Sequence, residues 1–170
     1  MPAAELPPPT GTPYRIGLVC LGNICRSPMA DVVLSELVDR AGLAAEVEVS
    51  SSGTGGWHVG QPMDPRAAAT LVANDYDPSR HLAQQFDAAW SDRDLVLAMD
   101  SGNLTEVRAQ LSDRAAHGAG RLRMFRDFDP VGAGDVPDPY YGGADGFAEV
   151  LRMVERTSIA IVEQLERHLH

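Results

Sequence analysis

A short apolar segment that leads directly into a glycine-containing loop and a helix start constrains this chain more than any other feature. Residues 14–20 (YRIGLVC) are typical of a buried strand, and Gly22 and Asn23 are residue types that tolerate a positive φ. Ser27 and Pro28 have the pattern of a helix N-cap followed by proline at the first helical position. The sequence therefore predicts a loop that wraps around a helix N-terminus.

This loop carries a thiol, Cys20, at one end and a guanidinium, Arg26, at the other. Backbone N–H groups of such a loop point inward, the helix dipole adds a partial positive charge, and Arg26 can donate to two phosphate oxygens at once. The same field favours the thiolate form of Cys20, which is the nucleophilic form. We therefore predict a phosphate-binding loop whose other members are Leu21, Gly22, Asn23, Ile24, Cys25 and Ser27.

A second segment, residues 126–143, is rich in Asp, Pro and Gly and longer than most connections in a compact domain, which favours a functional loop. Two adjacent tyrosines near its end, Tyr140 and Tyr141, can form rigid aromatic walls for a ring-shaped leaving group. The segment contains four acids, of which we interpret the first two as capping turns: Asp127, Asp129, Asp135 and Asp138.

The motifs CLGNICRSP at residues 20–28 and DPYYGG at residues 138–143 resemble the C-x5-R-S loop and the acid loop of the low molecular weight protein tyrosine phosphatases. The resemblance covers residues 14–168. It implies hydrolysis of phosphotyrosine in proteins through a phosphocysteine intermediate, with Cys20 as nucleophile, Arg26 as phosphate clamp and Asp138 as general acid and base. It also implies phosphotyrosine-containing proteins as substrates, inorganic phosphate as product, and no metal or other cofactor.

Further positions match the same family. Trp57 matches an aromatic pocket wall, although a tryptophan is also an ordinary core residue. Gln84 departs from the arginine that the family commonly has there, which puts a secondary contact in doubt. The resemblance assigns three polar residues to hydrogen bonds that shape the loop and one acid to a buried place beneath it: Asn23, Ser51, His81 and Asp100. A lone histidine such as His81 is weak evidence for a role.

Length and composition fit one α/β domain, because 170 residues with 44% hydrophobic content can bury a single substantial core. Residues 1–13 hold four prolines before residue 10 and no basic residue, which predicts a disordered tail and not a targeting segment. Residues 14–170 are then predicted to form the single domain.

Charge and cysteine usage restrict partners and compartment. The net charge is −10, and all 14 basic residues are arginines without a basic stripe, which argues against a nucleic-acid partner. No apolar run approaches the ~20 residues of a membrane span, so we expect no membrane association. The two cysteines share one loop, which is typical of a reducing cytoplasm.

Strand and helix patterns alternate along the chain. Short apolar or alternating segments predict strands at residues 14–20, 46–50, 94–99 and 121–125. Apolar residues at helical spacing predict helices after residue 27 with Gly42 just past the end, from Asp64-Pro65 to about residue 74, over 101–111, and from Phe147 to Leu165. The pattern favours a four-stranded parallel sheet with helices on both faces, and a ligand at the carboxyl ends of the strands.

Two other classes of function remain open at this stage. An arsenate reductase on the same fold would relay electrons through further cysteines, whereas this chain has only Cys20 and Cys25. A non-catalytic phosphate or phosphopeptide binder, or a sugar phosphotransferase subunit that carries phosphate on cysteine, would have no need of the acid Asp138. Metal-free turnover of an aryl phosphate would separate these alternatives from a phosphatase.

Overall fold

The computed structural model describes residues 4–111 and 120–169 of the chain. Its centre is a sheet of four parallel strands in the order β2-β1-β3-β4. The strands are β1 (Tyr14–Cys20), β2 (Val47–Gly53), β3 (Leu95–Ala98) and β4 (Leu122–Met124). The predicted fold class, an α/β protein with a four-stranded parallel sheet, is confirmed.

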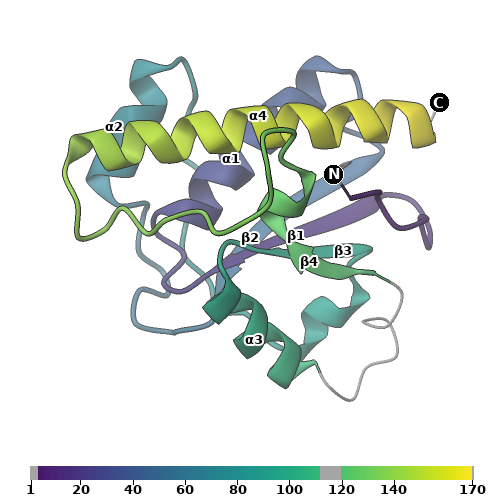
Figure 1. The fold of residues 1–170 in the computed structure, drawn as a ribbon, viewed down its shortest axis with the longest axis horizontal. Helices are drawn as coiled ribbons and strands as arrows, with labels where there is room; N and C mark the ends of the chain where they lie inside the picture. Colours follow the sequence, from purple (N-terminus) through teal and green to yellow (C-terminus); the bar gives the residue numbers. More distant parts are fainter. Residues whose placement is uncertain (1–3, 112–119, 170) are drawn as a thin grey trace.

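Helices cover both faces of the sheet (Figure 1). Three helices lie together on one face, where α1 and α2 pack against α4: α1 (Arg26–Arg40), α2 (Pro65–Ala73) and α4 (Ala144–Leu169). The other face carries α3 (Ser101–Gln110) and the short 3-10 helix η1 (Ala88–Asp92). A second 3-10 helix, η3 (Phe125–Phe128), follows β4 directly and contacts α4.

The apolar core is split by the sheet into two layers. Alternate residues of β1, such as Ile16 and Leu18, belong to the large layer under α1 and α4. Val19 points to the smaller layer, which Phe86 and Trp90 fill. Gly17 lies in β1 beneath Trp90, and a Cβ there would come within 2.6 Å of the indole ring.

The ends of the first two helices can be compared with the capping residues that the sequence predicts. Gly42 follows α1 with a φ of +77° and Asp64 caps α2 through Arg66 N, both as predicted. The prediction that Ser27 is the N-cap of the first helix is wrong, because α1 begins at Arg26 and Cys25 flanks it without a side-chain cap. The Ser27 hydroxyl turns back toward the loop instead.

The N-terminal segment also differs from its prediction. Residues 4–13, predicted to be part of a disordered tail, lie against the domain in this structure. Leu6 is buried in the main core, its N–H donates to Gln164 Oε1 at 2.8 Å, and the hydroxyl of Tyr14 donates to Pro7 O at 2.8 Å. The proline content is compatible with this path because the segment runs along the surface and forms few backbone hydrogen bonds of its own.

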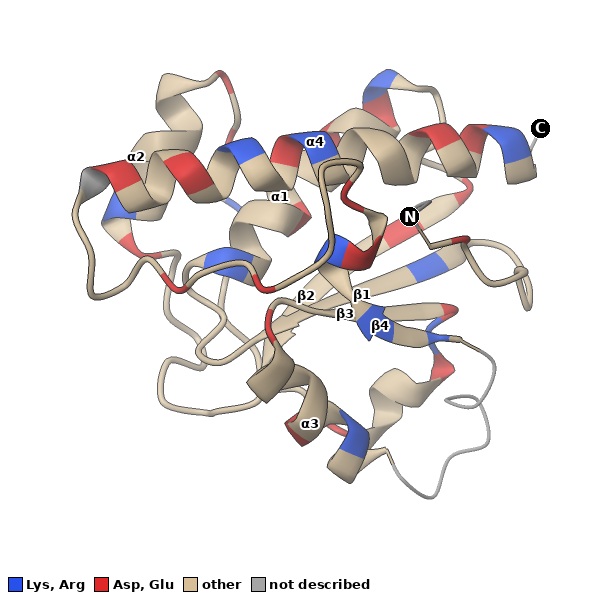
Figure 2. Cartoon of the chain, in the orientation of Figure 1, with Lys and Arg blue, Asp and Glu red and all other residues tan. Residues whose placement is uncertain are grey.

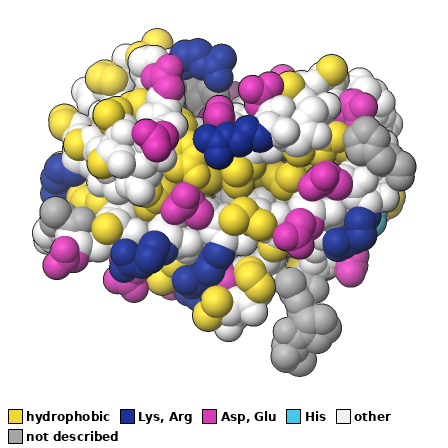
Figure 3. Space-filling view, turned by 90° about the horizontal axis from the view of Figure 1, so that it is seen from above, with side chains coloured by type: hydrophobic (Ala, Val, Ile, Leu, Met, Phe, Trp, Pro, Cys, Tyr) yellow, Lys and Arg dark blue, Asp and Glu magenta, His cyan; other side chains and the backbone are white. Residues whose placement is uncertain are grey.

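Charged side chains of both signs lie on α1, α3 and α4 (Figure 2). On the face that α4 covers, acidic and basic groups are interspersed without a patch of one sign (Figure 3). Among residues 4–111 and 120–169, no helix has the length and apolar character needed to cross a bilayer.

Candidate active site

The loop between β1 and α1 lies at the carboxyl end of the sheet. Cys20 is the last residue of β1 and Arg26 the first of α1, so residues 21–25 turn around the helix N-terminus. Asn23 has a φ of +58°, the left-handed conformation that its sequence type predicts. Gly53, at the end of β2, lets this loop approach closely, because a Cβ there would lie 2.6 Å from Leu21 O.

Side-chain hydrogen bonds fix the shape of the loop around the thiol. Cys20 Sγ lies 2.9 Å from Ser27 Oγ. The amide of Asn23 donates to Ser27 Oγ at 2.8 Å and to Ser51 Oγ at 3.0 Å. The Ser27 hydroxyl can donate its proton to the sulfur or to Ser52 O, which lies 3.4 Å away, and a proton donated to the sulfur stabilises negative charge there.

Two residues behind the loop support Asn23 from outside. His81 Nε2 lies 2.7 Å from Asn23 O, and because a carbonyl only accepts, Nε2 carries a proton. Burial lowers the pKa of His81, while the bond to Asn23 acts in the opposite direction. Gln84 donates from its backbone to Asn23 Oδ1 and from its side chain to Ser51 O, both at 2.9 Å. Gln84 therefore joins the loop-supporting set, although its identity departs from the family pattern.

Arg26 is 3% exposed and is held by three oxygens. Its Nη1 donates to Asp100 Oδ2 at 2.6 Å and to Val136 O at 3.0 Å, and its Nη2 lies 3.7 Å from Asp138 Oδ2. Burial alone would lower the pKa of Arg26, but the Cys20 sulfur and the Asp100 carboxylate raise it above its ordinary value. The guanidinium is therefore a fixed, permanently charged group beside the thiol.

Asp100 has a different place from the one that the sequence predicts. It was expected to be buried beneath the loop, but a quarter of its side chain is exposed. One oxygen binds Arg26, and the other caps α3 by accepting from Asn103 N at 2.7 Å. Asp100 thus holds the guanidinium and caps α3.

A pocket of about 310 Å³ opens over Cys20. Most predicted site residues line it: Cys20, Leu21, Gly22, Ile24, Cys25, Arg26, Trp57, Asp138, Tyr140 and Tyr141. Its rim is aromatic and open, since Trp57 is 70% and Tyr141 91% exposed. Arg66, which is paired with Asp64, stacks 5.3 Å from the Tyr140 ring and supports that wall. Exposed rings around a thiol at the base fit a flat aromatic substrate that enters end-on.

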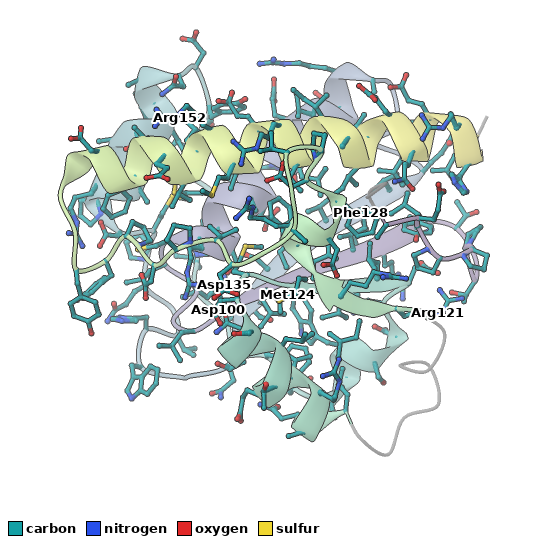
Figure 4. The ribbon with its side chains drawn as sticks, viewed as in Figure 1. Asp100, Arg121, Met124, Phe128, Asp135 and Arg152 are labelled. Carbon is teal, nitrogen blue, oxygen red and sulfur yellow. The ribbon has the colours of Figure 1, made fainter. Side chains whose placement is uncertain are left out.

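The two candidate acids of the second loop have separate surroundings. Asp138 lines the pocket, with Oδ2 near Arg26 and Oδ1 accepting from Tyr140 N at 3.0 Å. Asp135 Oδ1 instead accepts from Ser101 N at 3.0 Å, at the start of α3, where it lies beside Asp100 (Figure 4). Asp138 is thus the acid that faces Cys20.

Comparison with known proteins agrees with this geometry. A family model described as "Low molecular weight phosphotyrosine protein phosphatase" matches residues 15–170. The chain belongs to this family. A low molecular weight protein-tyrosine-phosphatase of Streptomyces coelicolor is 48% identical over 161 residues, which cover 90% of this chain and 96% of that protein.

Solved structures resemble this low molecular weight phosphatase over most of its length. YfkJ from Bacillus subtilis superposes with a TM-score of 0.86 at 28% identity, over 95% of this chain and 99% of that one. Wzb from Vibrio vulnificus, solved in complex with benzylphosphonate, gives 0.76 at 26% identity, over 89% and 99% of the two chains.

Sequence reasoning missed two contributors to the phosphatase pocket. His58 lines it beside Trp57, with Nδ1 2.9 Å from Gln61 Oε1. The carbonyl of Val136 holds Arg26, a contact that no side-chain pattern reveals. The position of His58 next to Trp57 was a usable signal, whereas a backbone acceptor depends on the path of the loop.

A larger hollow of about 710 Å³ lies along α1 and β2 and includes His81. Its lining contains no cysteine, and four acids outnumber Arg80 and His81 there, so it repels a phosphate dianion: Asp31, Glu36, Asp39 and Asp77. The smaller pocket over Cys20 is therefore the candidate active site.

Proposed function

We propose that this protein hydrolyses phosphotyrosine in proteins through a phosphocysteine intermediate. The observation that carries the proposal is the convergence of Cys20, Arg26 and Asp138 on one pocket, with the sulfur beside a hydroxyl donor and the acid beside the guanidinium. The names of the relatives and their end-to-end similarity support the same activity.

The first step transfers the phosphoryl group to sulfur. The Cys20 thiolate attacks phosphorus in line, and a sulfur–phosphorus bond forms as the phosphorus–oxygen bond to the ring breaks. Arg26 and the N–H groups of the loop stabilise the equatorial oxygens. Asp138 gives its proton to the leaving oxygen, which would otherwise depart as a phenolate whose conjugate acid has a pKa of about 10.

The second step releases phosphate. Asp138, now a carboxylate, takes a proton from a water molecule that attacks phosphorus, and Cys20 leaves as a thiolate that Ser27 stabilises. The products are the free phenol and inorganic phosphate. A thiolate nucleophile works only while it is reduced, which supports a cytoplasmic location.

The aromatic lining of the pocket supports an aryl phosphate as substrate. The benzylphosphonate complex of the Vibrio vulnificus relative places a ring and a phosphonate in a protein of the same fold. Here Trp57, Tyr140 and Tyr141 line the pocket that opens over the thiol, where their rings can contact a tyrosine ring.

Hydrolysis of a phosphotyrosine peptide in the presence of a metal chelator tests the proposal. We expect steady turnover by the native chain and a phosphorylated protein, mapped to Cys20 after rapid quenching in denaturant. Cys20→Ser should fold normally and lose essentially all activity, because the loop cannot activate a hydroxyl of far higher pKa. Arg26→Lys should also be nearly inactive, since an ammonium lacks the planar fork. Reduction of arsenate without phosphatase turnover, or phosphopeptide binding without hydrolysis, would overturn the proposed function.

A further inference from the structure

The segment that delivers Asp138 to the pocket is organised by one arginine. Arg126 lies in η3, and its side chain is 14% exposed. Its Nη2 donates to Gly132 O at 2.9 Å, and its Nη1 donates to Asp135 O at 3.0 Å. Its Nε donates to Asp129 Oδ2 at 2.9 Å. One guanidinium therefore binds three successive points of the loop between η3 and the acid.

The Asp129 carboxylate gives Arg126 a rigid base. Its side chain is fully buried and also accepts from Arg156 of α4, at 2.9 and 3.0 Å, and from Val131 N at 2.9 Å. Burial would raise the pKa of Asp129, but the hydrogen bonds from Arg156, Val131 and Arg126 keep it below its ordinary value. Arg126 is thus anchored to a charged group that α4 holds in place.

Two glycines give the loop conformational freedom near the carbonyls that Arg126 binds. Gly132 and Gly134 have φ values of +155° and +141°, conformations that glycine adopts without a side chain to restrict it. Among the described residues, Arg126 is the hydrogen-bond partner of the Gly132 and Asp135 carbonyls. A loop of this composition needs such tertiary contacts to keep a single path.

Beyond this grip the chain reaches the pocket within three residues. Val136 N donates to Met99 O at 2.8 Å, and Val136 O accepts from Arg26. These bonds fix the side of the loop that touches the phosphate clamp, independently of Arg126. The chain enters Val136 from Asp135, whose carbonyl accepts from Arg126 and whose carboxylate accepts from Ser101 N at 3.0 Å.

We propose that Arg126 is a positioning residue for proton transfer: it fixes the loop so that the Asp138 carboxyl meets the leaving oxygen. The proposal rests on the proposed function, in which Asp138 is the general acid. Displacement of a catalytic group by about 1 Å can cost two orders of magnitude in rate, so a looser loop reduces proton transfer while phosphate binding persists. Lysine cannot replace Arg126, because one ammonium cannot span three acceptors that lie in different directions.

The test is Arg126→Lys, measured with substrates whose leaving groups differ. We expect kcat for phosphotyrosine, a poor leaving group, to fall roughly 10-fold, within the range that a misplaced acid permits. An aryl phosphate with a strongly acidic phenol needs no protonation, and its kcat should change less than about 2-fold. The inhibition constant for inorganic phosphate should stay the same, since Val136, Asp100 and Arg26 keep their own contacts.

Two control variants separate positioning from general loss of stability. Arg156→Lys weakens the Asp129 anchor but leaves Arg126 bonded to the Gly132 and Asp135 carbonyls, so it should lower Tm and alter the leaving-group dependence of kcat less than Arg126→Lys does. Arg152→Lys, on the exposed side of α4 (Figure 4), should change neither Tm nor the leaving-group dependence. Arg126→Lys should also add little in an Asp138→Asn background, because the group that it positions is already absent.

Equal losses with both substrates in Arg126→Lys, or the same leaving-group change in Arg156→Lys, would overturn the positioning role. Failure of the proposed function looks different: there, Asp138→Asn itself would show no leaving-group dependence. A full additional loss from Arg126→Lys in the Asp138→Asn background would likewise show that Arg126 acts on something other than the acid.

Discussion

Asp135 and Asp138 are three residues apart in one loop, but their carboxylates have different neighbours. Asp138 lines the pocket beside Arg26, whereas Asp135 accepts from Ser101 N. We predict that Asp138→Asn slows hydrolysis of phosphotyrosine by ~10²–10⁴, because an amide cannot protonate the leaving oxygen. An activated aryl phosphate should be affected much less. Steady-state kcat with both substrates measures the difference.

Asp135→Asn is the matched control for that prediction. Asparagine keeps an oxygen that can accept from Ser101 N, so kcat should remain near the native value with both substrates. A larger loss in Asp135→Asn than in Asp138→Asn, accompanied by the altered leaving-group dependence, would mean that the acid has been assigned wrongly.

Cys25 provides a second residue-scale prediction, concerning oxidation. Both cysteines are reduced and buried in one loop. Peroxide should convert the Cys20 thiolate to a sulfenic acid, and attack by the Cys25 sulfur then forms a disulfide and releases water. Burial, and after it the negative charge of Asp64, raises the pKa of Cys25 to about 12, so its attacking thiolate is scarce at neutral pH. We therefore expect disulfide formation to accelerate as pH rises.

The measurement is the fraction of activity that a dithiol restores after a peroxide pulse at pH 7 and at pH 9. The native enzyme should recover at both values, with faster disulfide formation at pH 9. Cys25→Ser should recover less, because its sulfenic acid is oxidised further to irreversible forms. Recovery of Cys25→Ser as complete as that of the native enzyme would refute the protective role.

At the scale of the elements, α1 carries an aspartate, Asp31, whose ionised form is disfavoured by its surroundings. Burial raises the pKa of Asp31 from 3.8 to about 6 in the folded protein, although hydrogen bonds from Ser35 and Ser51 oppose the shift. The folded state therefore holds a proton between these two values that the unfolded state releases, and stability falls as pH rises through this window. Two pK units correspond to at most about 3 kcal/mol.

We accordingly predict that Asp31→Asn raises the free energy of unfolding at pH 7 by about 1–3 kcal/mol and has little effect below pH 4. Urea unfolding at pH 4, 5, 6 and 7 tests this, with Asp39→Asn, on the exposed side of the same helix, as a control that should change little. Destabilisation by Asp31→Asn at pH 7 would mean that the folded protein stabilises the ionised carboxylate more than burial penalises it.

The elements differ in how far sequence could predict them. All four strands and the helices containing strong periodicity were predictable, because their apolar spacing follows from burial against one sheet. The N-cap prediction for Ser27 was wrong because a serine before a proline has the N-cap pattern, whereas in the structure its hydroxyl binds Cys20 and Asn23. Asp100 could be recognised as important but not located, since its partner Arg26 is 74 residues away. The hydrogen bonds from Arg126 to backbone carbonyls could not be predicted from a pattern of side chains.

At the scale of the whole molecule, the N-terminal segment binds the two ends of the chain together. Ala4 N donates to Asp127 O at 2.9 Å, and the side chain of Gln164 in α4 binds Ala4 O and Leu6 N. Farther along, the backbone and hydroxyl of Thr10 both donate to the buried carboxylate of Asp94. The proline-rich composition predicts disorder here, whereas in the structure the burial of Leu6 and hydrogen bonds to Gln164, Asp127 and Asp94 hold the segment against the domain.

Leu6 therefore makes the state of this segment measurable. Its side chain is 5% exposed within the main core, so we predict that Leu6→Ala lowers the free energy of unfolding by about 2 kcal/mol, the lower end for a buried leucine because a terminal segment can partly collapse into the space. Ile159→Ala, an exposed position on α4, should change stability by less than about 0.5 kcal/mol. Leu6 lines no part of the pocket over Cys20, so kcat well below Tm should be unchanged. Chemical denaturation of both variants tests whether the N-terminal segment is bound to the domain. If the segment is detached in solution, Leu6→Ala will be as stable as the native chain.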